Sequence, residues 1–326
     1  MILVRTPFRV SFVGGGSDIP SFYERSHGAV VSTSIDKYMY LSMHKKFDEG
    51  FRVAYSRIEE VLRRDEIDHP IVKNVLNYFN ISENLEITST ADIPGRGTGL
   101  GSSSSYCISL IRALSEYFNY DLNKQQIANL ACHIEIDLCQ EPIGKQDQFA
   151  CALGGYNKFE FNQLGEVTTK PLNLKEDYIE FFEAHWMAFY TGETRSASKI
   201  LKDQAKTIKT HDKFAHMKEM VDLVQPFVDS LVSEDIEQSS DLLNLNWRLK
   251  KQLADGISNS KIDSMYDAAL KAGAMAGKLL GAGAGGFLFL LVPPNKRSAV
   301  KHAMQGRKLV TFKSDNSGTS VVYRGQ

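Results

Sequence analysis

The sequence has almost no net charge, few cysteines and no long apolar run, and each shortage excludes a class of protein. Its 38 lysine and arginine residues balance 39 aspartate and glutamate residues, so the formal net charge is −1. Such a chain has no overall positive field that would attract nucleic acid or anionic lipid. The longest clean apolar run, from Phe287 to Val292, is far below the roughly 20 residues that a membrane-spanning helix needs. We therefore expect neither a nucleic-acid partner nor membrane insertion.

The four cysteines and eight histidines form no metal-binding or redox pattern. Cys107, Cys132, Cys139 and Cys151 include no Cys-x-x-Cys pair, and they are too sparse for a disulfide framework. No His-Glu-x-x-His arrangement occurs. We expect reduced cysteines, and any metal is expected to arrive with a substrate. Because the first residues include Arg5 and offer no cleavage site of small residues, the sequence predicts a cytoplasmic protein.

The pattern of apolar residues predicts an α+β protein of two domains. At about 150 residues per domain the chain corresponds to roughly two domains, and we place the boundary near Tyr178, between residues 1–177 and residues 178–326. Residues 29–45 are predicted as a pair of strands, and residues 268–280 as a helix of small residues. The other predicted strands cover residues 2–13, 53–56, 85–89, 186–190 and 287–292, with a hairpin in 154–175, and the other helices cover 67–79, 106–118, 124–138 and much of 195–255.

A run of glycines and serines from Pro94 to Ser105 carries the strongest chemical signal. It follows a predicted strand and precedes an amphipathic helix. Glycines let the backbone approach a ligand closely, and a helix N-terminus offers N–H donors with partial positive charge, so the segment suits a polyphosphate. The alternative is a flexible loop in which Ser102 or Ser103 caps the helix. Four glycines and four serines exceed what a cap requires, and we favour anion binding, although not by a P-loop, whose Gly-x-x-x-x-Gly-Lys-[Ser/Thr] pattern is absent.

A second glycine cluster, Gly281 to Gly286, matches the pattern Gly-x-Gly-x-x-Gly. In a dinucleotide-binding fold that pattern follows a strand and opens a helix, whereas here we expect a helix before it and a strand after it. The cluster is therefore not predicted to bind a dinucleotide. Close packing of a helix against a strand on small residues is an equal alternative to a binding role.

Three acidic residues and one arginine lie in segments that could join a phosphate site. Glu135 lies on a predicted helix, and Asp147 lies downstream of it. A carboxylate beside a phosphate site can accept a proton from an attacking hydroxyl, and a second one can hold Mg²⁺. Taken alone, either acid is more often a solvated surface charge. In the turn after Arg9, three glycines precede Asp18, which could bind hydroxyl groups or cap the segment after Pro20.

Together these segments resemble the GHMP kinase superfamily, which is named for galactokinase, homoserine kinase, mevalonate kinase and phosphomevalonate kinase. Pro7 to Asp18 resembles the first motif of the family, Pro94 to Ser104 its nucleotide loop, and Leu279 to Phe287 its third motif. The resemblance covers essentially the whole chain. Finding all three motifs in this order makes a chance resemblance remote.

Three segments are most similar to the sugar 1-kinases of D-glycero-D-manno-heptose 7-phosphate and to fucokinase-like relatives. They are Gly14 to Asp18, Gly144 to Gln148 and Tyr190 to Ser198. Where galactokinases carry Glu-His before Thr-Asp, this chain has two glycines before Ser17 and Asp18. It lacks two polar contacts there and has more space, so galactose is a doubtful acceptor.

The resemblance implies an ATP- and Mg²⁺-dependent kinase with an N-terminal domain like ribosomal protein S5 domain 2 and a ferredoxin-like C-terminal domain. Asp147 would be the general base toward the acceptor hydroxyl, and Arg9 would steady that base or the transferring phosphoryl group. Ser103 and Glu135 would hold Mg²⁺. The residues that would wrap the ATP phosphates are Pro94, Gly95, Gly97, Gly99, Leu100, Gly101, Ser102, Ser103 and Ser104. Those that would contact the acceptor are Gly15, Gly16, Ser17, Asp18, Thr191, Gly192, Arg195 and Gly283.

A phosphorylated acceptor needs cations, and Arg195 and Lys199 would share one face of a helix. Arg96 and Lys145 are less favoured, and plain solvated charges are an equal alternative. We expect phosphorylation of the anomeric hydroxyl of D-glycero-D-manno-heptose 7-phosphate, with fucose or a non-sugar alcohol such as mevalonate as alternative acceptors. A non-catalytic relative that keeps the fold as a binding module is the alternative of a different class. The sequence leaves a homodimer open.

Overall fold

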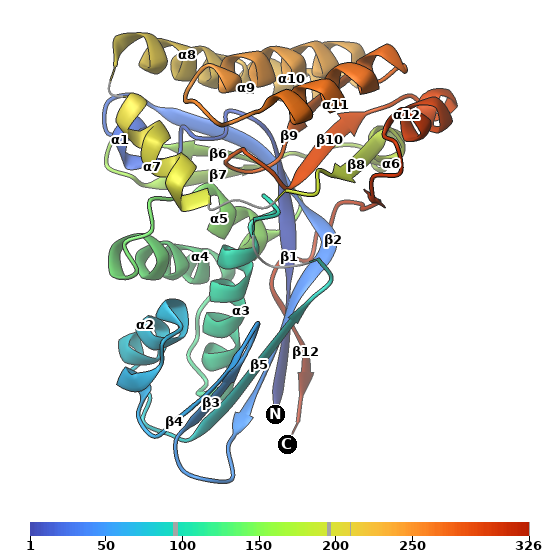
Figure 1. The fold of residues 1–326 in the computed structure, drawn as a ribbon. Helices are drawn as coiled ribbons and strands as arrows, with labels where there is room; N and C mark the ends of the chain where they lie inside the picture. The colour runs from blue at the N-terminus through green and yellow to red at the C-terminus, as the bar shows by residue number, and fades with distance from the viewer. Residues whose placement is uncertain (94–96, 194–196, 209, 326) are drawn as a thin grey trace.

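The computed structural model describes residues 1–93, 97–193, 197–208 and 210–325. A large sheet carries helices on one side, a helical layer with a smaller sheet lies at one end of it, and both chain termini lie at the other end (Figure 1). This arrangement confirms the expected α+β class. The strands of the larger sheet are β1 (Ile2–Val13), β2 (Gly28–Lys45), β3 (Phe51–Ala54), β4 (Ile58–Val61), β5 (Leu85–Ala91), β6 (Tyr156–Phe161), β7 (Val167–Pro171) and β12 (Ser320–Arg324).

β2 is one strand of 18 residues and not the predicted pair. β1 pairs along one edge of β2, whereas the other edge is shared by β6, which pairs with residues 28–33, and β5, which pairs with residues 39–45. The main path of the sheet runs β12-β1-β2-β5-β3-β4, and β7 pairs with β6. The two segments expected from the sequence are therefore two pairing regions of one continuous strand.

The helices of the first half pack against the middle of the larger sheet. α3 (Ser102–Tyr117) and α5 (Gln146–Leu153) contact β1 and β2, and α2 (Pro70–Tyr78) and α4 (Lys124–Cys132) contact α3 (Figure 1). The predicted helix 124–138 changes character within its length, because α4 continues as a π-helical turn, η2 (His133–Leu138). The extra residue of a π turn shifts which side chains face inward, and both Ile134 and Glu135 are buried. The short elements of this half are α1 (Pro20–Tyr23) and η1 (Arg64–Glu66).

The smaller sheet is antiparallel and has the order β11-β8-β10-β9. Helices α8 to α11 form a layer beside it, at the top of Figure 1. The strands are β8 (Trp186–Tyr190), β9 (Ala276–Leu279), β10 (Phe287–Leu291) and β11 (Leu309–Val310). The helices of the second half are α6 (Glu176–Ala184), α7 (Ala197–Thr207), α8 (His211–Asp222), α9 (Val224–Val232), α10 (Ile236–Lys251), α11 (Ser260–Lys271), η3 (Pro294–Lys296) and α12 (Arg297–Ala303).

The predicted helix over residues 268–280 is wrong in its second part. α11 ends at Lys271, and residues 276–279 form β9, which pairs with β10 and is buried throughout. Alanine and glycine carry little local preference for a strand, so tertiary packing decides here. A Cβ atom on Gly277 would lie 2.7 Å from the carbonyl oxygen of Phe289, which explains a small residue at this strand position.

One buried cluster joins the two halves of the chain. The ring of Phe12 in β1 lies 5.6 Å from that of Phe227 in α9 and 5.9 Å from that of Phe289 in β10, measured between centroids. Aromatic pairs of this kind add about 0.5–1.5 kcal/mol beyond the burial of their area. The last strand, β12, pairs with β1, so the chain returns to the first sheet after completing the second. The domain boundary near Tyr178 stays a prediction. β12 follows that boundary in the sequence but belongs to the sheet of the first half.

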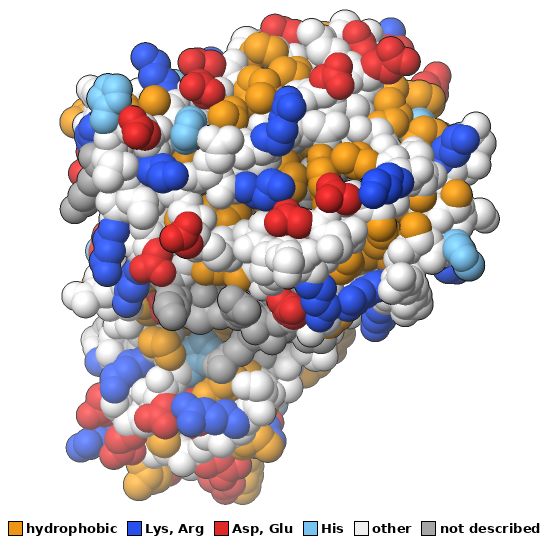
Figure 2. All heavy atoms as spheres, turned by 45° about the horizontal axis from the view of Figure 1, so that its top comes forward, with side chains coloured by type: hydrophobic (Ala, Val, Ile, Leu, Met, Phe, Trp, Pro, Cys, Tyr) orange, Lys and Arg blue, Asp and Glu red, His pale blue; other side chains and the backbone are white. Residues whose placement is uncertain are grey.

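The surface agrees with the near-zero net charge. On the face in Figure 2, lysine and arginine side chains are interspersed with aspartate and glutamate side chains. Such mixing produces no extended field of one sign on that face. None of the helices in the described part of the chain has the length and apolar character that a membrane crossing requires.

Candidate active site

Arg9 and Asp147 form a bidentate ion pair beside the N-terminus of α3. Arg9 Nε donates to Asp147 Oδ1 at 2.8 Å, and Arg9 Nη2 donates to Asp147 Oδ2 at 2.7 Å. β1 supplies the arginine, and the first turn of α5 supplies the carboxylate. Burial alone would lower the pKa of Arg9, but the charge of Asp147, its hydrogen bond and the smaller effects of Cys151 and Asp18 together raise the pKa. The guanidinium therefore stays charged and fixes both carboxylate oxygens.

The glycine–serine segment is joined to this pair. Arg9 Nη1 donates to the carbonyl oxygen of Gly99 at 2.6 Å, and the Arg9 backbone N–H donates to Leu100 O at 3.0 Å. α3 begins after Gly101, whose φ of +77° favours glycine. A Cβ atom on Gly101 would lie 3.4 Å from Asp147 Oδ2, so the ion pair lies at the helix N-terminus.

The alternative in which a serine caps α3 is excluded. The N-cap residue is Gly101, and no side-chain capping bond is present there. The first N–H groups of a helix lack intrahelical acceptors, so the start of α3 suits an anion. Ser102 to Ser104 lie in this first turn. Pro94, Gly95 and Arg96 lie outside the described residues, so the first part of the predicted loop stays a prediction.

Asp18 lies buried in the turn after β1. Its Oδ1 accepts the Gly16 N–H at 3.0 Å, and its Oδ2 accepts the Gln146 N–H at 3.1 Å. Burial raises the pKa of Asp18, the hydrogen bond from Gln146 lowers it, and the charge of Asp147 raises it. The capping alternative does not apply, because the N-cap of α1 is Ile19 and no side chain caps that helix. Asp18 therefore joins the two segments that carry the first motif and the proposed base.

The glycine turn before Asp18 is shaped by close contacts. Gly14 has a φ of +82°, and a Cβ atom there would lie 2.1 Å from the carbonyl oxygen of Ala29. The Ser17 hydroxyl donates to Ala29 O at 2.9 Å and accepts the Ala29 N–H at 3.0 Å. Ser17, predicted to contact the acceptor, thus holds the turn against β2. At Gly15, in contrast, a Cβ atom would meet nothing closer than 3.1 Å.

Glu135 is the centre of a second polar cluster next to α3. Ser103 Oγ donates to Glu135 Oε1 at 2.7 Å, and Gln148 Nε2 donates to Glu135 Oε2 at 2.8 Å. The side chain is fully buried, and burial raises the pKa of Glu135 to about 7 although its hydrogen bonds lower it. It is therefore not a solvated surface charge.

The donor set of this cluster fits Mg²⁺ bound together with a nucleotide. A serine hydroxyl and a carboxylate are oxygen ligands of the kind that Mg²⁺ prefers, and this ion usually takes only one or two carboxylates besides phosphates and water. Gln148 Oε1, which belongs to the same cluster, is buried without a hydrogen-bond partner in the described structure. Within the described residues, no group of three or more His, Cys, Asp or Glu side chains could hold a metal ion by itself. Phosphate oxygens would have to complete the ligand set.

The third glycine segment packs against the nucleotide loop and not as a helix against a strand. It joins β9 to β10. A Cβ atom on Gly281 would lie 2.4 Å from Gly99 Cα, and one on Gly286 would lie 2.4 Å from Thr98 O. Gly283 lies against Ile257, where a Cβ atom would meet the Ile257 carbonyl oxygen at 2.8 Å, and its contact with the acceptor stays a prediction. The third glycine segment and the nucleotide loop therefore meet backbone to backbone.

Thr191 and Gly192 lie at the end of β8, next to this loop contact. The Thr191 N–H and hydroxyl both donate to Gly286 O, at 2.9 and 3.1 Å. Arg307 Nη1 donates to Thr191 O at 2.8 Å. Thr191 thus orders the third glycine segment, and its predicted contact with the acceptor stays a prediction. Arg195 and the side chain of Lys199 lie outside the described residues. Lys145 Nζ lies 5.3 Å from the centre of the Tyr23 ring.

Two buried residues of the second half, Asn246 and Lys278, hold the first glycine turn, and no sequence motif had pointed to them. Asn246 Oδ1 accepts the Gly14 N–H at 3.0 Å. Lys278 Nζ donates to Ser11 O at 2.7 Å and to Phe12 O at 2.8 Å. These contacts attach the end of β1 to α10 and β9, so the second half helps to shape the turn that carries Asp18.

Lys250, the last residue but one of α10, also belongs to the site although no motif had pointed to it. Leu243, Trp247 and Lys250 lie on one helical face, at spacings of four and three, and all three are buried. A lysine that continues the apolar stripe of a helix could have indicated a buried cation here. Lys250 Nζ donates to Gly281 O at 3.0 Å, and its charge interacts with those of Asp18, Arg9 and Asp147. The ammonium group therefore belongs to the same charged cluster.

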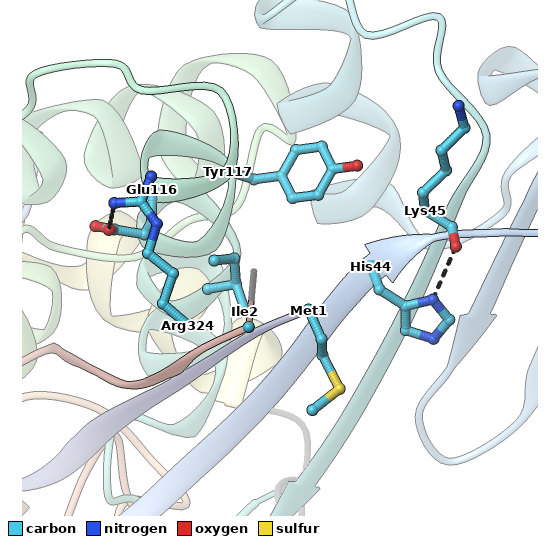
Figure 3. Close-up of a pocket in the computed structure, with 8 residues that line it drawn as sticks. Met1, Ile2, His44, Lys45, Glu116, Tyr117 and Arg324 are labelled. Atoms are coloured by element: carbon cyan, nitrogen blue, oxygen red, sulfur yellow. Dashed lines mark hydrogen bonds and ion pairs between the residues drawn. The ribbon is translucent and has the colours of Figure 1, made fainter.

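A separate hollow of about 430 Å³ lies at the far end of the larger sheet, near both chain termini (Figure 3). In it Arg324 Nη1 donates to Glu116 Oε1 at 2.8 Å, and His44 Nδ1 lies 2.9 Å from Lys45 O. It shares no residue with the polar clusters around α3. The chemistry therefore concentrates at the start of α3 and not in this hollow.

Comparison with known proteins agrees with the geometry. The family profile described as GHMP kinases N terminal domain matches residues 68–155, and that described as GHMP kinases C terminal matches residues 227–310. D-glycero-alpha-D-manno-heptose 7-phosphate kinase of Campylobacter jejuni is 30% identical over 308 residues, which cover 91% of this chain and 91% of that protein. Mevalonate kinase of Pyrococcus horikoshii is 27% identical, over 91% of this chain and 82% of the relative.

Among solved structures, a D-glycero-D-manno-heptose 1-phosphate kinase from Bacteroides thetaiotaomicron superposes with a TM-score of 0.84. The match covers all of both chains at 24% sequence identity. A mevalonate kinase from Methanococcus jannaschii superposes with a TM-score of 0.73 at 20% identity, over 96% of this chain and 98% of that chain. At these identities the likeness establishes the fold, and it confirms the expected two-domain architecture.

Proposed function

The chain belongs to the GHMP kinases and is a phosphotransferase, and from that premise we propose that it phosphorylates the anomeric hydroxyl of a sugar phosphate. ATP is the donor, and D-glycero-D-manno-heptose 7-phosphate, converted to the 1,7-bisphosphate, is the acceptor. The observation that carries the proposal is the Arg9–Asp147 ion pair at the N-terminus of α3. The 30% identity to the Campylobacter heptose 7-phosphate kinase supports the choice of acceptor.

Asp147 is the general base in this mechanism. The carboxylate takes the proton of the acceptor hydroxyl as the oxygen attacks the γ-phosphorus and the bond to the bridging oxygen of ADP breaks. Both oxygens of Asp147 already bind Arg9, which fixes their direction. The N–H groups at the start of α3 stabilise negative charge on the phosphates. Positioning and electrostatics would supply most of the acceleration.

Ser103 and Glu135 would hold Mg²⁺, with Gly97, Gly99, Leu100 and the first turn of α3 around the nucleotide phosphates. The ion would neutralise the charge that develops on the transferring group. Gln148 holds the Glu135 carboxylate through its side-chain amide at 2.8 Å. A ligand that is oriented by such a neighbour loses less freedom on binding the ion.

Asp18 and the glycine turn would bind the acceptor. Asp18 is buried, and its carboxylate can accept hydrogen bonds from sugar hydroxyls beyond the two backbone N–H groups it already binds. A Cβ atom on Gly15 would lie 3.1 Å from the Ser11 hydroxyl oxygen, so the glycine lets polar groups approach the turn closely. Arg195 would bind the distal phosphate, so Arg195→Ala should raise KM for the sugar phosphate far more than KM for ATP. An unchanged KM for the sugar phosphate would contradict that role.

A coupled assay of ADP release tests the proposal with four acceptors: heptose 7-phosphate, fucose, galactose and mevalonate. We expect the highest kcat/KM with heptose 7-phosphate, and a large loss of turnover with this acceptor for the Asp147→Asn variant. Faster turnover of fucose or mevalonate would change the proposed acceptor but would still support kinase activity. No ADP release with any acceptor, from folded protein with Mg²⁺, would favour a non-catalytic binding module.

A further inference from the structure

Lys250 lies where three glycine segments of the site meet. Its Nζ atom donates to Gly281 O, and Gly281 packs directly on Gly99 of the nucleotide loop. The ammonium group also lies close to the glycine turn before Asp18, because a Cβ atom on Gly15 would be 3.8 Å from Lys250 Nζ. The ammonium group therefore lies between the segment that takes the nucleotide and the segment that takes the acceptor.

The hydrogen bonds of Lys250 are incomplete. An ammonium group can donate three hydrogen bonds. Within the described residues, Lys250 Nζ donates one, to Gly281 O. Its side chain is 5% exposed, so water does not readily supply the others. A Cβ atom on Gly15 would also lie 3.1 Å from Ser11 Oγ and 3.5 Å from Gln146 Nε2, and the buried Ser11 hydroxyl lacks a partner in the described structure. Lys250 therefore keeps unpaired donors next to other polar groups at the Gly15 backbone, and a ligand oxygen could pair with them.

Lys278 provides an internal comparison. It is also a buried lysine of the second half, but its ammonium already donates to two carbonyl oxygens, Ser11 O and Phe12 O, at the end of β1. A lysine with two backbone acceptors on one strand has a structural explanation. Lys250 has one backbone acceptor, and its ammonium group interacts with the charged residues of the site.

We propose that Lys250 binds an oxygen of the phosphoryl group in transfer, as a catalytic cation that the second half contributes to the site. The inference rests on the proposed function. Lys250 forms no covalent bond and keeps its proton throughout; its charge offsets the negative charge of the phosphoryl group as the acceptor oxygen approaches. It also compensates for Asp18 and Asp147, two carboxylates that would otherwise repel that group.

The charge state of Lys250 gives a pH dependence. Burial lowers its pKa to about 8, while Asp18 and Asp147 raise the pKa and Arg9 lowers it. Burial also lowers the pKa of Lys278, and the nearby charges of Lys250 and Arg9 lower it further. Because the cationic form is the one that binds the phosphoryl oxygen, kcat/KM should fall as the pH rises through about 8.

The test compares Lys250→Met with Lys250→Arg and, as the matched control, Lys278→Met. For Lys250→Met we expect a loss of kcat of about 100-fold or more and no fall in its remaining kcat/KM at alkaline pH. Lys250→Arg should recover about ten-fold of that loss, because a cation is restored. Lys278→Met should melt at lower temperature yet keep the alkaline fall. A Lys250→Met enzyme with kcat within about three-fold of the wild type, or with the alkaline fall intact, would overturn the inference.

A binding measurement separates this inference from the proposed function. By calorimetry with Mg²⁺, Lys250→Met should bind the β,γ-imido analogue of ATP at least about ten-fold more weakly than the wild type, with ADP affinity changed by less than about two-fold. This result needs no acceptor and no turnover. If the wild type phosphorylates none of the acceptors, the proposed function fails, whereas equal weakening of both nucleotides, or of neither, refutes the role of Lys250.

Discussion

Asp147 and Glu135 lie on either side of the start of α3, and their surroundings differ in charge. Asp147 is one-quarter exposed and is held by the guanidinium of Arg9. Glu135 is fully buried, and the partners that hold it, Ser103 and Gln148, are neutral. Burial raises the pKa of Glu135 to about 7. Ionising a buried carboxyl group that has only neutral donors costs free energy until a cation binds beside it. A guanidinium partner, in contrast, favours the ionised form of a carboxyl group.

The difference explains how two acids so close together can have separate tasks. Consecutive residues of α5 serve the two clusters, since Asp147 binds Arg9 and Gln148 binds Glu135. One helical step therefore separates the proposed base from the residue that holds the proposed metal ligand Glu135. Environment, and not residue type, distinguishes the two acids.

Asp147→Asn should have the largest effect on activity. The amide cannot accept the hydroxyl proton, so kcat should fall by about 10²–10⁴-fold. Affinity for ADP by calorimetry should change by less than about two-fold, because α3 and its loop stay in place. The matched control is Asp137→Asn, an exposed acid of η2 that contacts His133, which should retain wild-type kcat. Near-normal turnover by Asp147→Asn would assign the base elsewhere.

The raised pKa of Glu135 makes the stability of the protein depend on pH. Since the pKa of Glu135 rises from 4.5 to about 7 on folding, the folded protein keeps a proton that the unfolded chain has lost. Its contribution is fully present below pH 4.5 and is lost as the pH rises to about 7. The total is about 3 kcal/mol, at about 1.4 kcal/mol for each pKa unit.

Glu135→Gln removes this titration. In urea unfolding with a chelator present, the free energy of unfolding of the variant relative to the wild type should increase by about 3 kcal/mol between pH 4.5 and pH 7. Asp18, whose pKa is also raised, contributes equally to both proteins and cancels. A difference that stays constant with pH would mean that Glu135 is already ionised in the folded protein.

The sequence predicted the parts of the site that lie in short local motifs. Arg9, Asp18 and Asp147 lie in continuous segments whose glycines and polar residues are unusual enough to be noticed, and the structure brings the three together. The helix N-terminus of the nucleotide loop was also predictable, because a strand, a glycine run and an amphipathic helix follow in order. Each of these signals is local.

Lys250 and Lys278 could not be distinguished from surface lysines in the same way. Lys250 is buried and its neighbour Lys251 is about one-third exposed, and the difference depends on α10 packing against β9. That packing was hidden because β9 was predicted as helix. The error in one strand therefore concealed both cations that the second half places behind the glycine turn.

Glu135→Gln should also weaken metal dependence, with a smaller effect than Asp147→Asn. Replacing a carboxylate ligand by an amide should raise the Mg²⁺ concentration for half-maximal activity by about 10–100-fold. Titration of Mg²⁺ at saturating ATP measures this shift. The combination of higher stability without metal and weaker metal use would separate a ligand from a structural acid. An unchanged Mg²⁺ requirement would remove Glu135 from the proposed metal site.

Ser103→Ala is expected to give the smallest effect. It removes one neutral hydrogen bond to Glu135 and leaves the carboxylate with the amide of Gln148, so we expect a loss of about 1 kcal/mol in stability at neutral pH. Because the Ser103 hydroxyl lowers the pKa of Glu135, its loss should move the pH window of the stability change upward. The Mg²⁺ requirement should rise less than for Glu135→Gln, since a hydroxyl ligand can be replaced by water. If Ser103→Ala instead abolished Mg²⁺ use while leaving the titration of Glu135 in place, the hydroxyl would be the main ligand and Glu135 only its support.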